Sequence, residues 1–227
     1  MKCWICDSPA DSGEHKAKAS DVRSIIGTPT NKIPFHLRMG DEKLKLQGLD
    51  VDLLKWTQKI CSDCNNSLSS PYDRAWEKLS SFLQKHPNGL PSVNLKTVYG
   101  DRFNDKFLNL YLYFAKQFGC YVSNENIGID LKDFSYSLIN KKVISNFYIR
   151  LSYFENWPVH TMIALTPMDI SSDVGGVNIA IAGYAIGPWC VDMTYWNPKV
   201  RAPSIIESSK KPPARNLKLD VFLTKAE

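Results

Sequence analysis

Four of the six cysteines are spaced as metal ligands. Cys3 and Cys6 form one C-x-x-C pair, and Cys61 and Cys64 form a second. Two thiolates separated by two residues can face one ion, and two such pairs complete the tetrahedral four-thiolate site that structural zinc prefers. We therefore predict one structural Zn²⁺ shared by all four side chains. Because residues 7–60 lie between the pairs, this long stretch must loop out and return.

Residues that can bind a metal ion or transfer a proton follow each cysteine pair. Glu14 and His15 come after the first pair, and Asn65 directly follows Cys64. With these residues the sequence resembles the zinc-knuckle branch of the HNH endonucleases over roughly residues 1–86. The resemblance implies a ββα-metal fold, in which two short strands present the acidic residue and the His. The helix after the second cysteine pair then presents an Asn or His to the same catalytic ion.

The resemblance also implies a role for each of these residues. His15 matches the general base that deprotonates the attacking water. Glu14 and Asn65 match ligands of a catalytic divalent ion, Mg²⁺ or another. Hydrolysis of a phosphodiester needs a base that titrates near neutral pH and a cation beside the scissile phosphate. The resemblance thus predicts a metal-dependent endonuclease, a phosphodiester hydrolase.

Two alternatives remain open at this point. The HNH family usually has an Asn a few residues before the second cysteine pair, and residues 55–59 contain none. A non-catalytic zinc-binding module that docks nucleic acid or protein, as a regulator or inhibitor, is therefore the second interpretation. Asp73 is either a further metal ligand or a favourable charge at a helix N-terminus.

The net charge of +5 is concentrated in one stretch. Residues 199–218 carry six basic side chains against one acidic one, and they contain three prolines, with a fourth at position 198, which predicts an extended loop. Such a loop is either solvated or a strap that contacts phosphates. The candidate nucleic-acid contacts, with DNA as the expected partner, are Lys16, Lys18, Lys210, Lys211 and Arg215.

The hydrophobic pattern predicts the elements that position these residues. Apolar residues at helical spacing indicate a helix over 70–86, with Ser70 as its N-cap, and another from Phe107 to Phe118 that Gly119 ends. Short helices are expected at 21–26, after a Ser20-Asp21 cap, and at 131–143. Residues 28–50 are expected to be loop-like, with strand character at 44–46. Alternation indicates strands around residues 149–153, 177–181, 191–195 and 217–223.

This order predicts an α+β fold with two domains. A zinc-stapled ββα-metal-like domain at 1–87 precedes an α+β domain at 93–227 with a mostly antiparallel sheet. The second domain is expected to serve recognition or regulation, and a protein partner or homodimer would use it. No apolar stretch reaches about 18 residues, and the N-terminus lacks an apolar export signal. We therefore expect no membrane association and a cytoplasmic location.

Overall fold

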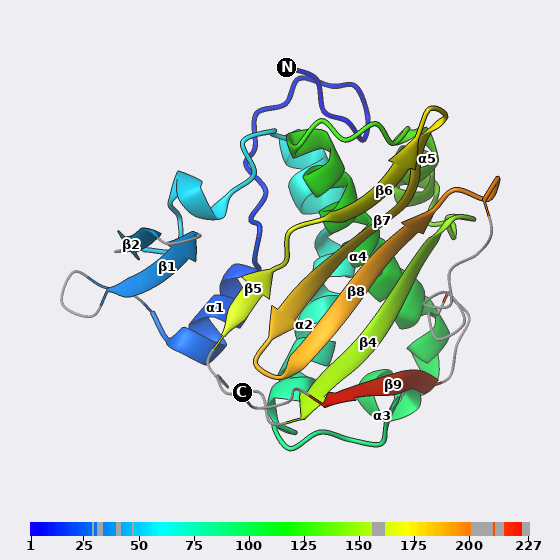
Figure 1. Ribbon diagram of the computed structural model, residues 1–227. Coiled ribbons are helices and arrows are strands. Elements are labelled where there is room, and N and C mark those ends of the chain that lie inside the picture. Colours follow the sequence, from blue (N-terminus) through cyan, green and yellow to red (C-terminus); the bar gives the residue numbers. More distant parts are fainter. Residues whose placement is uncertain are drawn as a thin grey trace.

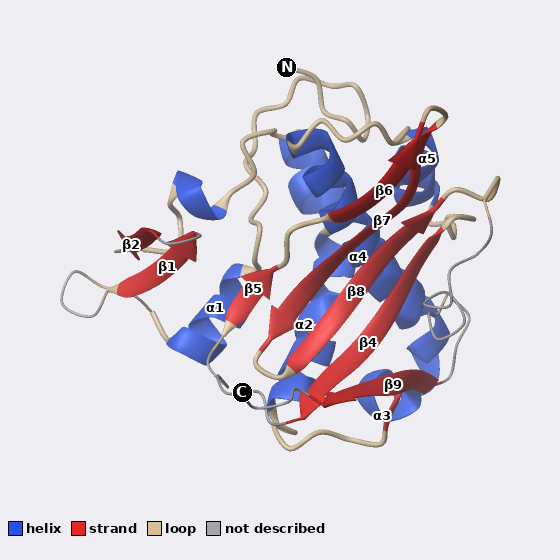
Figure 2. Cartoon of the chain, viewed as in Figure 1, coloured by secondary structure: helices blue, strands red, loops and turns tan. Residues whose placement is uncertain are grey.

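A mostly antiparallel sheet backed by helices forms the body of the molecule (Figures 1 and 2). The computed structural model describes residues 1–28, 30, 34–39, 42–46, 48–155, 162–200, 211 and 216–223. In this part of the chain, helices and antiparallel strands occur together, as predicted for the α+β class. No helix among these residues is long and apolar enough to cross a bilayer.

Among the described residues, the large sheet has seven strands. Six of them lie in the order β3-β9-β4-β8-β7-β5, and β6 pairs with β7. Every pairing is antiparallel except β4 with β9, which is parallel. Their bounds are β3 Ser92–Asn94, β4 Phe147–Glu155, β5 Ile163–Leu165, β6 Asp169–Asp173, β7 Gly176–Ile186, β8 Trp189–Trp196 and β9 Asn216–Leu223.

The helices lie behind this sheet in the view of Figure 2. The longest two, α2 Ser70–Gln84 and α4 Phe103–Asn124, pack on each other, and α4 also packs on β4 and β8. The shorter helices are α1 Ala19–Ile26, α3 Leu95–Tyr99 and α5 Lys132–Asn140. The predicted boundary at 88–92 follows α2 and ends at the first residue of β3. The two-domain division stays a prediction, and one continuous buried core extends from Cys3 to Met193.

Several predicted ends and loops differ from the structure. The helix expected to stop at Gly119 continues to Asn124, and the glycine inside it makes room for a neighbouring side chain. A Cβ atom at this position would overlap the ring of Trp4. The helix after the second cysteine pair is preceded by a π-helical turn, Cys64–Leu68, and its N-cap is Ser69 instead of Ser70.

The segment expected to be mainly loop contains a β-hairpin. Strands β1 Phe35–Met39 and β2 Glu42–Leu46 pair antiparallel, with Phe35 opposite Leu46. The strand character expected at 44–46 is confirmed, whereas β1 was not predicted. In Figure 1 this hairpin projects from the body beside α1.

Asp21 joins the first helix to α2 and the sheet. Its carboxylate accepts hydrogen bonds from Trp76 Nε1 (2.7 Å), Ser80 Oγ (2.8 Å) and the Tyr184 hydroxyl (2.8 Å). Burial raises the pKa of Asp21 above its ordinary value, against the opposing effect of these hydrogen bonds. Asp21 was predicted to help cap the helix. Instead α1 begins at Ala19, and the Asp21 side chain lies in the core.

An Asp21→Ala variant is expected to lose at least about 3 kcal/mol of unfolding free energy, because three buried donors lose their acceptor. The raised pKa means that the native state binds this proton more tightly than the unfolded chain. The stabilisation from Asp21 is therefore largest at low pH and falls as the pH rises through the folded-state pKa. Urea unfolding near pH 4, close to the ordinary aspartate pKa, and near pH 8 measures this, and the loss should be larger near pH 4.

The matched control is Asp101→Ala, which removes a carboxylate that is 90% exposed and pairs with Lys96. This variant should change stability by no more than about 1 kcal/mol. A loss for Asp21→Ala that is equal at the two pH values, or larger near pH 8, would contradict the assignment.

Candidate functional site

The two cysteine pairs meet at one point. The Sγ atoms of Cys3, Cys6, Cys61 and Cys64 all lie within 4.8 Å of one another. Tetrahedral zinc with Zn–S bonds of about 2.3 Å separates its sulfurs by about 3.8 Å, so this cluster suits such an ion. The predicted convergence of both pairs on one possible metal site is confirmed. Among the described residues, no other group of three or more His, Cys, Asp or Glu side chains could hold an ion.

Cys6 differs from Cys61 and Cys64 in how readily it loses its proton. The Ser8 side chain donates a hydrogen bond that lowers the pKa of Cys6 to about 7, against the effect of burial. Burial raises the pKa of Cys61 and of Cys64 above the ordinary thiol value. Since the thiolate is the metal ligand, binding of an ion must displace protons from the buried pair.

A short antiparallel pairing brings the segment after Cys6 against the segment before Cys61. Isolated bridges join Ser12 to Ile60 and His15 to Lys55. The Trp56 amide donates to the Glu14 carbonyl at 2.9 Å within this pairing. Residues 12–16 are therefore held beside the chain that enters the second cysteine pair and continues into α2.

Asn65 fixes the same segment from the other side. Its Nδ2 donates to Ser12 Oγ at 2.8 Å and to the Gly13 carbonyl at 3.3 Å. Its own carbonyl accepts a hydrogen bond from Ser69 Oγ at 2.7 Å, at the start of α2. Asn65, which was predicted as a metal ligand or orienter, thus ties the loop before Glu14 to the helix.

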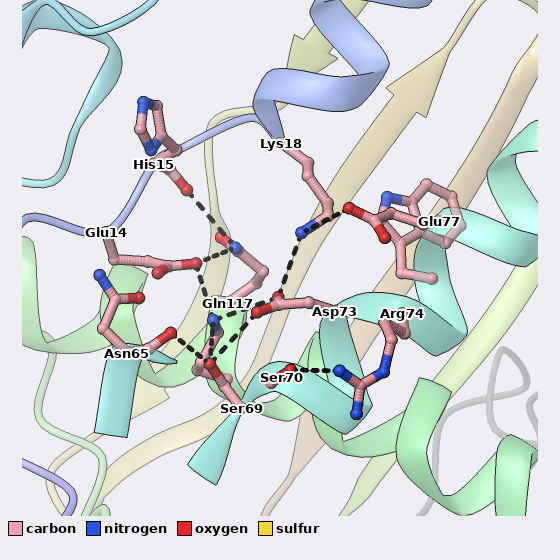
Figure 3. Close-up of polar contacts among 12 residues, drawn as sticks. Glu14, His15, Lys18, Asn65, Ser69, Ser70, Asp73, Arg74, Glu77 and Gln117 are labelled. Carbon is pink, nitrogen blue, oxygen red and sulfur yellow. Dashed lines mark hydrogen bonds and ion pairs between the residues drawn. The ribbon is translucent and has the colours of Figure 1, made fainter. Parts of the chain in front are cut away.

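His15 adjoins these residues with its ring directed away from Glu14 (Figure 3). The ring Nε2 lies 3.3 Å from the Leu49 carbonyl oxygen. A carbonyl only accepts hydrogen bonds, so this contact requires a hydrogen on Nε2. In the neutral ring, Nδ1 is then the nitrogen that can take up a proton.

All three residues predicted to be catalytic line one cavity of about 490 Å³. Glu14 and His15 enter it from the paired segment, and Asn65 from the turn before α2. Asp73 and Glu77 line it from α2, one turn apart. The structure therefore brings together Glu14, His15 and Asn65, although 49 residues separate His15 from Asn65 in the sequence.

The Glu14 carboxylate is buried and paired. Glu14 Oε1 lies 2.9 Å from the ammonium of Lys116 and accepts a hydrogen bond from Gln117 Nε2 at 3.0 Å (Figure 3). Both partners come from α4, and the Lys116 side chain is only 1% exposed. Burial alone would lower the pKa of Lys116, but the carboxylates of Glu14 and Asp73 outweigh it and raise that pKa. This buried charge therefore remains an ammonium.

The charges alternate across the cavity wall. Lys116 also lies 3.4 Å from Asp73, which in turn lies 3.5 Å from Lys18. Lys18 reaches Glu77 at 3.3 Å. Asp73, predicted as a metal ligand or a helix-end charge, is thus in the first turn of α2 and also bridges two lysines.

The lysines expected to contact nucleic acid are already engaged. Lys16 lies 5.6 Å from the ring centroid of Trp56, and Lys18 pairs with two carboxylates as described. The Lys211 ammonium donates to the Ser145 carbonyl and lies 3.9 Å from the ring centroid of Tyr148. The predictions for Lys210 and Arg215 fall outside the described residues.

The sequence contained one signal for the residues that were missed. Gln117 lies seven positions after Leu110 and three after Phe114, so it falls on the apolar stripe of its helix. A polar residue in such a stripe must find a buried partner. Its partner, Glu14, and the adjacent Lys116 could not be paired with it from spacing alone.

No family model, no curated protein and no solved structure matches this chain.

Proposed function

We propose that the protein is a metal-dependent, HNH-like endonuclease that hydrolyses nucleic-acid phosphodiester bonds with His15 as general base. The observation that carries this proposal is the meeting of Glu14, His15 and Asn65 at one cavity. The cysteine cluster is proposed to hold a structural Zn²⁺ that keeps the two segments together.

The local chain path supports a ββα-metal arrangement. The segments around Glu14 and Trp56 pair antiparallel, and the second of them leads through Cys61 and Cys64 into α2. This is the order of two short strands followed by a helix. The departure lies in the long connection between the two segments, which contains α1 and the hairpin β1–β2.

His15 is suited to accept a proton from water. Its Nε2 faces the Leu49 carbonyl, so Nδ1 is the basic nitrogen of the neutral ring. The hydrogen bonds from Asn65 to Ser12 and Gly13 hold the main chain that carries the ring. A positioned imidazole contributes about 10²–10⁴-fold to such a proton transfer.

The cavity can supply part of a ligand set for a divalent ion. Mg²⁺ is commonly held by one or two carboxylates, waters and substrate phosphate oxygens. Both contacts of Glu14 use Oε1, so Oε2 is the oxygen proposed for the ion, with Asn65 as the second ligand or its orienter. A divalent ion there would offset the charge that develops on the leaving oxygen.

A plasmid-nicking assay tests the proposal. Wild-type protein is incubated with supercoiled DNA in Mg²⁺, in Mn²⁺ and in EDTA, beside His15→Ala. We expect nicking that needs the divalent ion and falls about 10²–10⁴-fold in the variant. His86→Ala is the matched control, because His86 contacts Phe82 on α2 and does not line the cavity.

The nicking results separate the outcomes. Nicking that survives in EDTA, or that is equally strong in wild type and His15→Ala, would exclude this mechanism. An equal loss in His15→Ala and His86→Ala would point to damage to the fold instead of loss of a base.

One observation favours a second candidate, a zinc-binding module that docks nucleic acid without cleaving it. Glu14 already pairs with Lys116 and Gln117, which gives its carboxylate a structural role. Tight binding of DNA by wild type and by His15→Ala, with no nicking in any metal, is the result expected for this alternative.

A further inference from the structure

A second cavity, of about 670 Å³, lies beside the first and has the opposite charge. It is bounded by the outer face of α2 and by residues of α3 and α4; we call it the basic groove. Four cations line it, two from α2, one from the residue that follows α2 and one from α4, against a single carboxylate, that of Glu77. The four cations are Arg74, Lys78, Lys85 and Lys106.

The cavity of the candidate site has the reverse balance. Its lining includes five carboxylates and only three Lys or Arg side chains. The carboxylates are Asp11, Glu14, Asp50, Asp73 and Glu77. Such a lining attracts cations and repels a polyanion. A nucleic acid therefore needs a separate source of attraction, close to the cavity.

The cations of the basic groove are not explained by the stability of the fold. Lys78 follows Arg74 by four residues, so these like charges are neighbours on the helix surface and weaken the helix slightly. Lys85 lies on the same face, two turns further on. Among the ion pairs of the described residues, none involves Lys78, Lys85 or Lys106, and all three are exposed.

The floor of the basic groove is apolar and fixed. Val98 and Tyr99 are buried at 4% and 7% exposure, and Phe82 is half-buried. The Tyr99 hydroxyl donates to the Ala75 carbonyl at 2.8 Å, which ties α3 to α2 under the cations. The ammonium groups thus stand around a preformed hollow.

The groove and the candidate site are continuous. Glu77 lines both cavities, and it pairs with Lys18 on the side of the candidate site. Arg74 is adjacent to Asp73 on α2 and donates to Ser70 Oγ, as Figure 3 shows beside Glu77. A chain seated in the basic groove would therefore reach the candidate site across Glu77.

We propose that the basic groove binds the phosphates of a nucleic-acid backbone and delivers the strand to the candidate site. The delivery of the strand for cleavage rests on the proposed function. The binding of phosphates does not, because it is supported by the charge and shape of the basic groove. In this proposal, the basic side chains that attract the phosphates come from α2, the residue that follows it and α4, and not from residues 199–218.

The test is the salt dependence of binding. Fluorescently labelled DNA and RNA duplexes of one sequence are titrated with wild type and with the triple variant Lys78→Gln/Lys85→Gln/Lys106→Gln, from about 50 to about 200 mM salt. Each phosphate contact contributes about 0.9 to the slope of log K against log salt for duplex DNA. With the DNA duplex, we expect the magnitude of this slope to be about 2–3 units smaller for the triple variant than for wild type. If the RNA duplex binds more tightly than the DNA duplex, we expect a similar reduction with RNA.

The matched control is Lys132→Gln/Lys141→Gln/Lys142→Gln, which removes the same charge from exposed lysines in and after α5. Its slope should stay within about half a unit of wild type. Equal slopes for the two triple variants, an unchanged slope in the groove variant, or no binding of either duplex by wild type would each overturn the inference. The single variants Lys78→Gln and Lys106→Gln, each expected to remove about one unit, decide the matter if the triple variant fails to fold.

The two proposals can fail separately. Groove-dependent binding without any nicking leaves the groove standing and removes the catalytic role of His15. Metal-dependent nicking with an unchanged salt slope removes the groove alone.

Discussion

With Zn²⁺ in the cysteine cluster, as we propose, a Cys64→Ser variant is expected to lose the ion and the fold of the segments that the cysteines join. Hydroxyl oxygen is a poor replacement for thiolate, and three remaining sulfurs leave the tetrahedral site incomplete. Structural zinc sites contribute about 10–16 kcal/mol in small metal-dependent folds, so the loss is larger than any single core contact provides. Metal content after gel filtration and limited proteolysis of the N-terminal segments measure the two effects.

The effect should extend beyond the site, because the first cysteine pair is packed on the helices. Trp4 lies against Gly119 of α4, and the Ile5 carbonyl accepts a hydrogen bond from Ser135 of α5. Cys190→Ser is the control, since that buried thiol already lies 3.6 Å from Asp192 and is not in the cluster. One equivalent of zinc retained by Cys64→Ser, with unchanged proteolysis, would refute a shared four-cysteine site.

The second large effect is expected for Lys116→Met. This change keeps an unbranched side chain that is one atom shorter but removes the buried ammonium, so Glu14 and Asp73 lose their shared counter-charge. Removing one partner of a buried ion pair costs about 3–5 kcal/mol, because the other charge stays buried without compensation. Urea unfolding at neutral pH measures the change.

Two further variants identify the cause. Lys116→Met with Glu14→Gln should be more stable than Lys116→Met alone, because the uncompensated carboxylate is gone. Lys132→Met, at an ammonium whose side chain is 89% exposed, should change stability by less than about 0.5 kcal/mol. A double variant no more stable than the single one would show that the cost arises from packing and not from charge.

Local patterns predicted the elements that carry the site. Tyr72, Trp76, Leu79 and Leu83 recur at helical spacing, and this face of α2 is buried. Alternation likewise located strands β4, β7 and β8. In β7, however, the apolar residues Val177, Ile179 and Ile181 are only partly buried, and Ala180, Ala182 and Tyr184 are the buried ones. These patterns are readable because periodicity records which face of one element meets the core.

Pairings between distant segments were not readable. Strand β9 pairs in parallel with β4. This pairing depends on which strand of the folded sheet has an unpaired edge, and the residue pattern of one strand does not show that. The end of α4 was misjudged for a related reason. Glycine in a helix costs about 1 kcal/mol relative to alanine, and the approach of Trp4, which leaves no room for a Cβ atom, explains why glycine stands at this position.

Only the part of the site that local spacing determines was predicted. The cysteine spacing indicates a metal ligand set directly, so convergence of the four thiols followed from the sequence. The partners of Glu14 did not, because Lys116 and Gln117 lie in the other half of the chain and belong to an apolar helix. The basic groove was missed because its cations come from two helices and look like ordinary solvated lysines in the sequence.

The position of α4 limits how this candidate site can be transferred to another protein. The cysteine pairs, His15 and Asn65 all precede residue 87, and they look like a cassette that could be cut out and fused elsewhere. The buried carboxylate of Glu14, however, takes its counter-charge from Lys116, and the first cysteine pair rests on Gly119. A transplant must therefore carry α4 with it, and the smallest portable unit is discontinuous in the sequence.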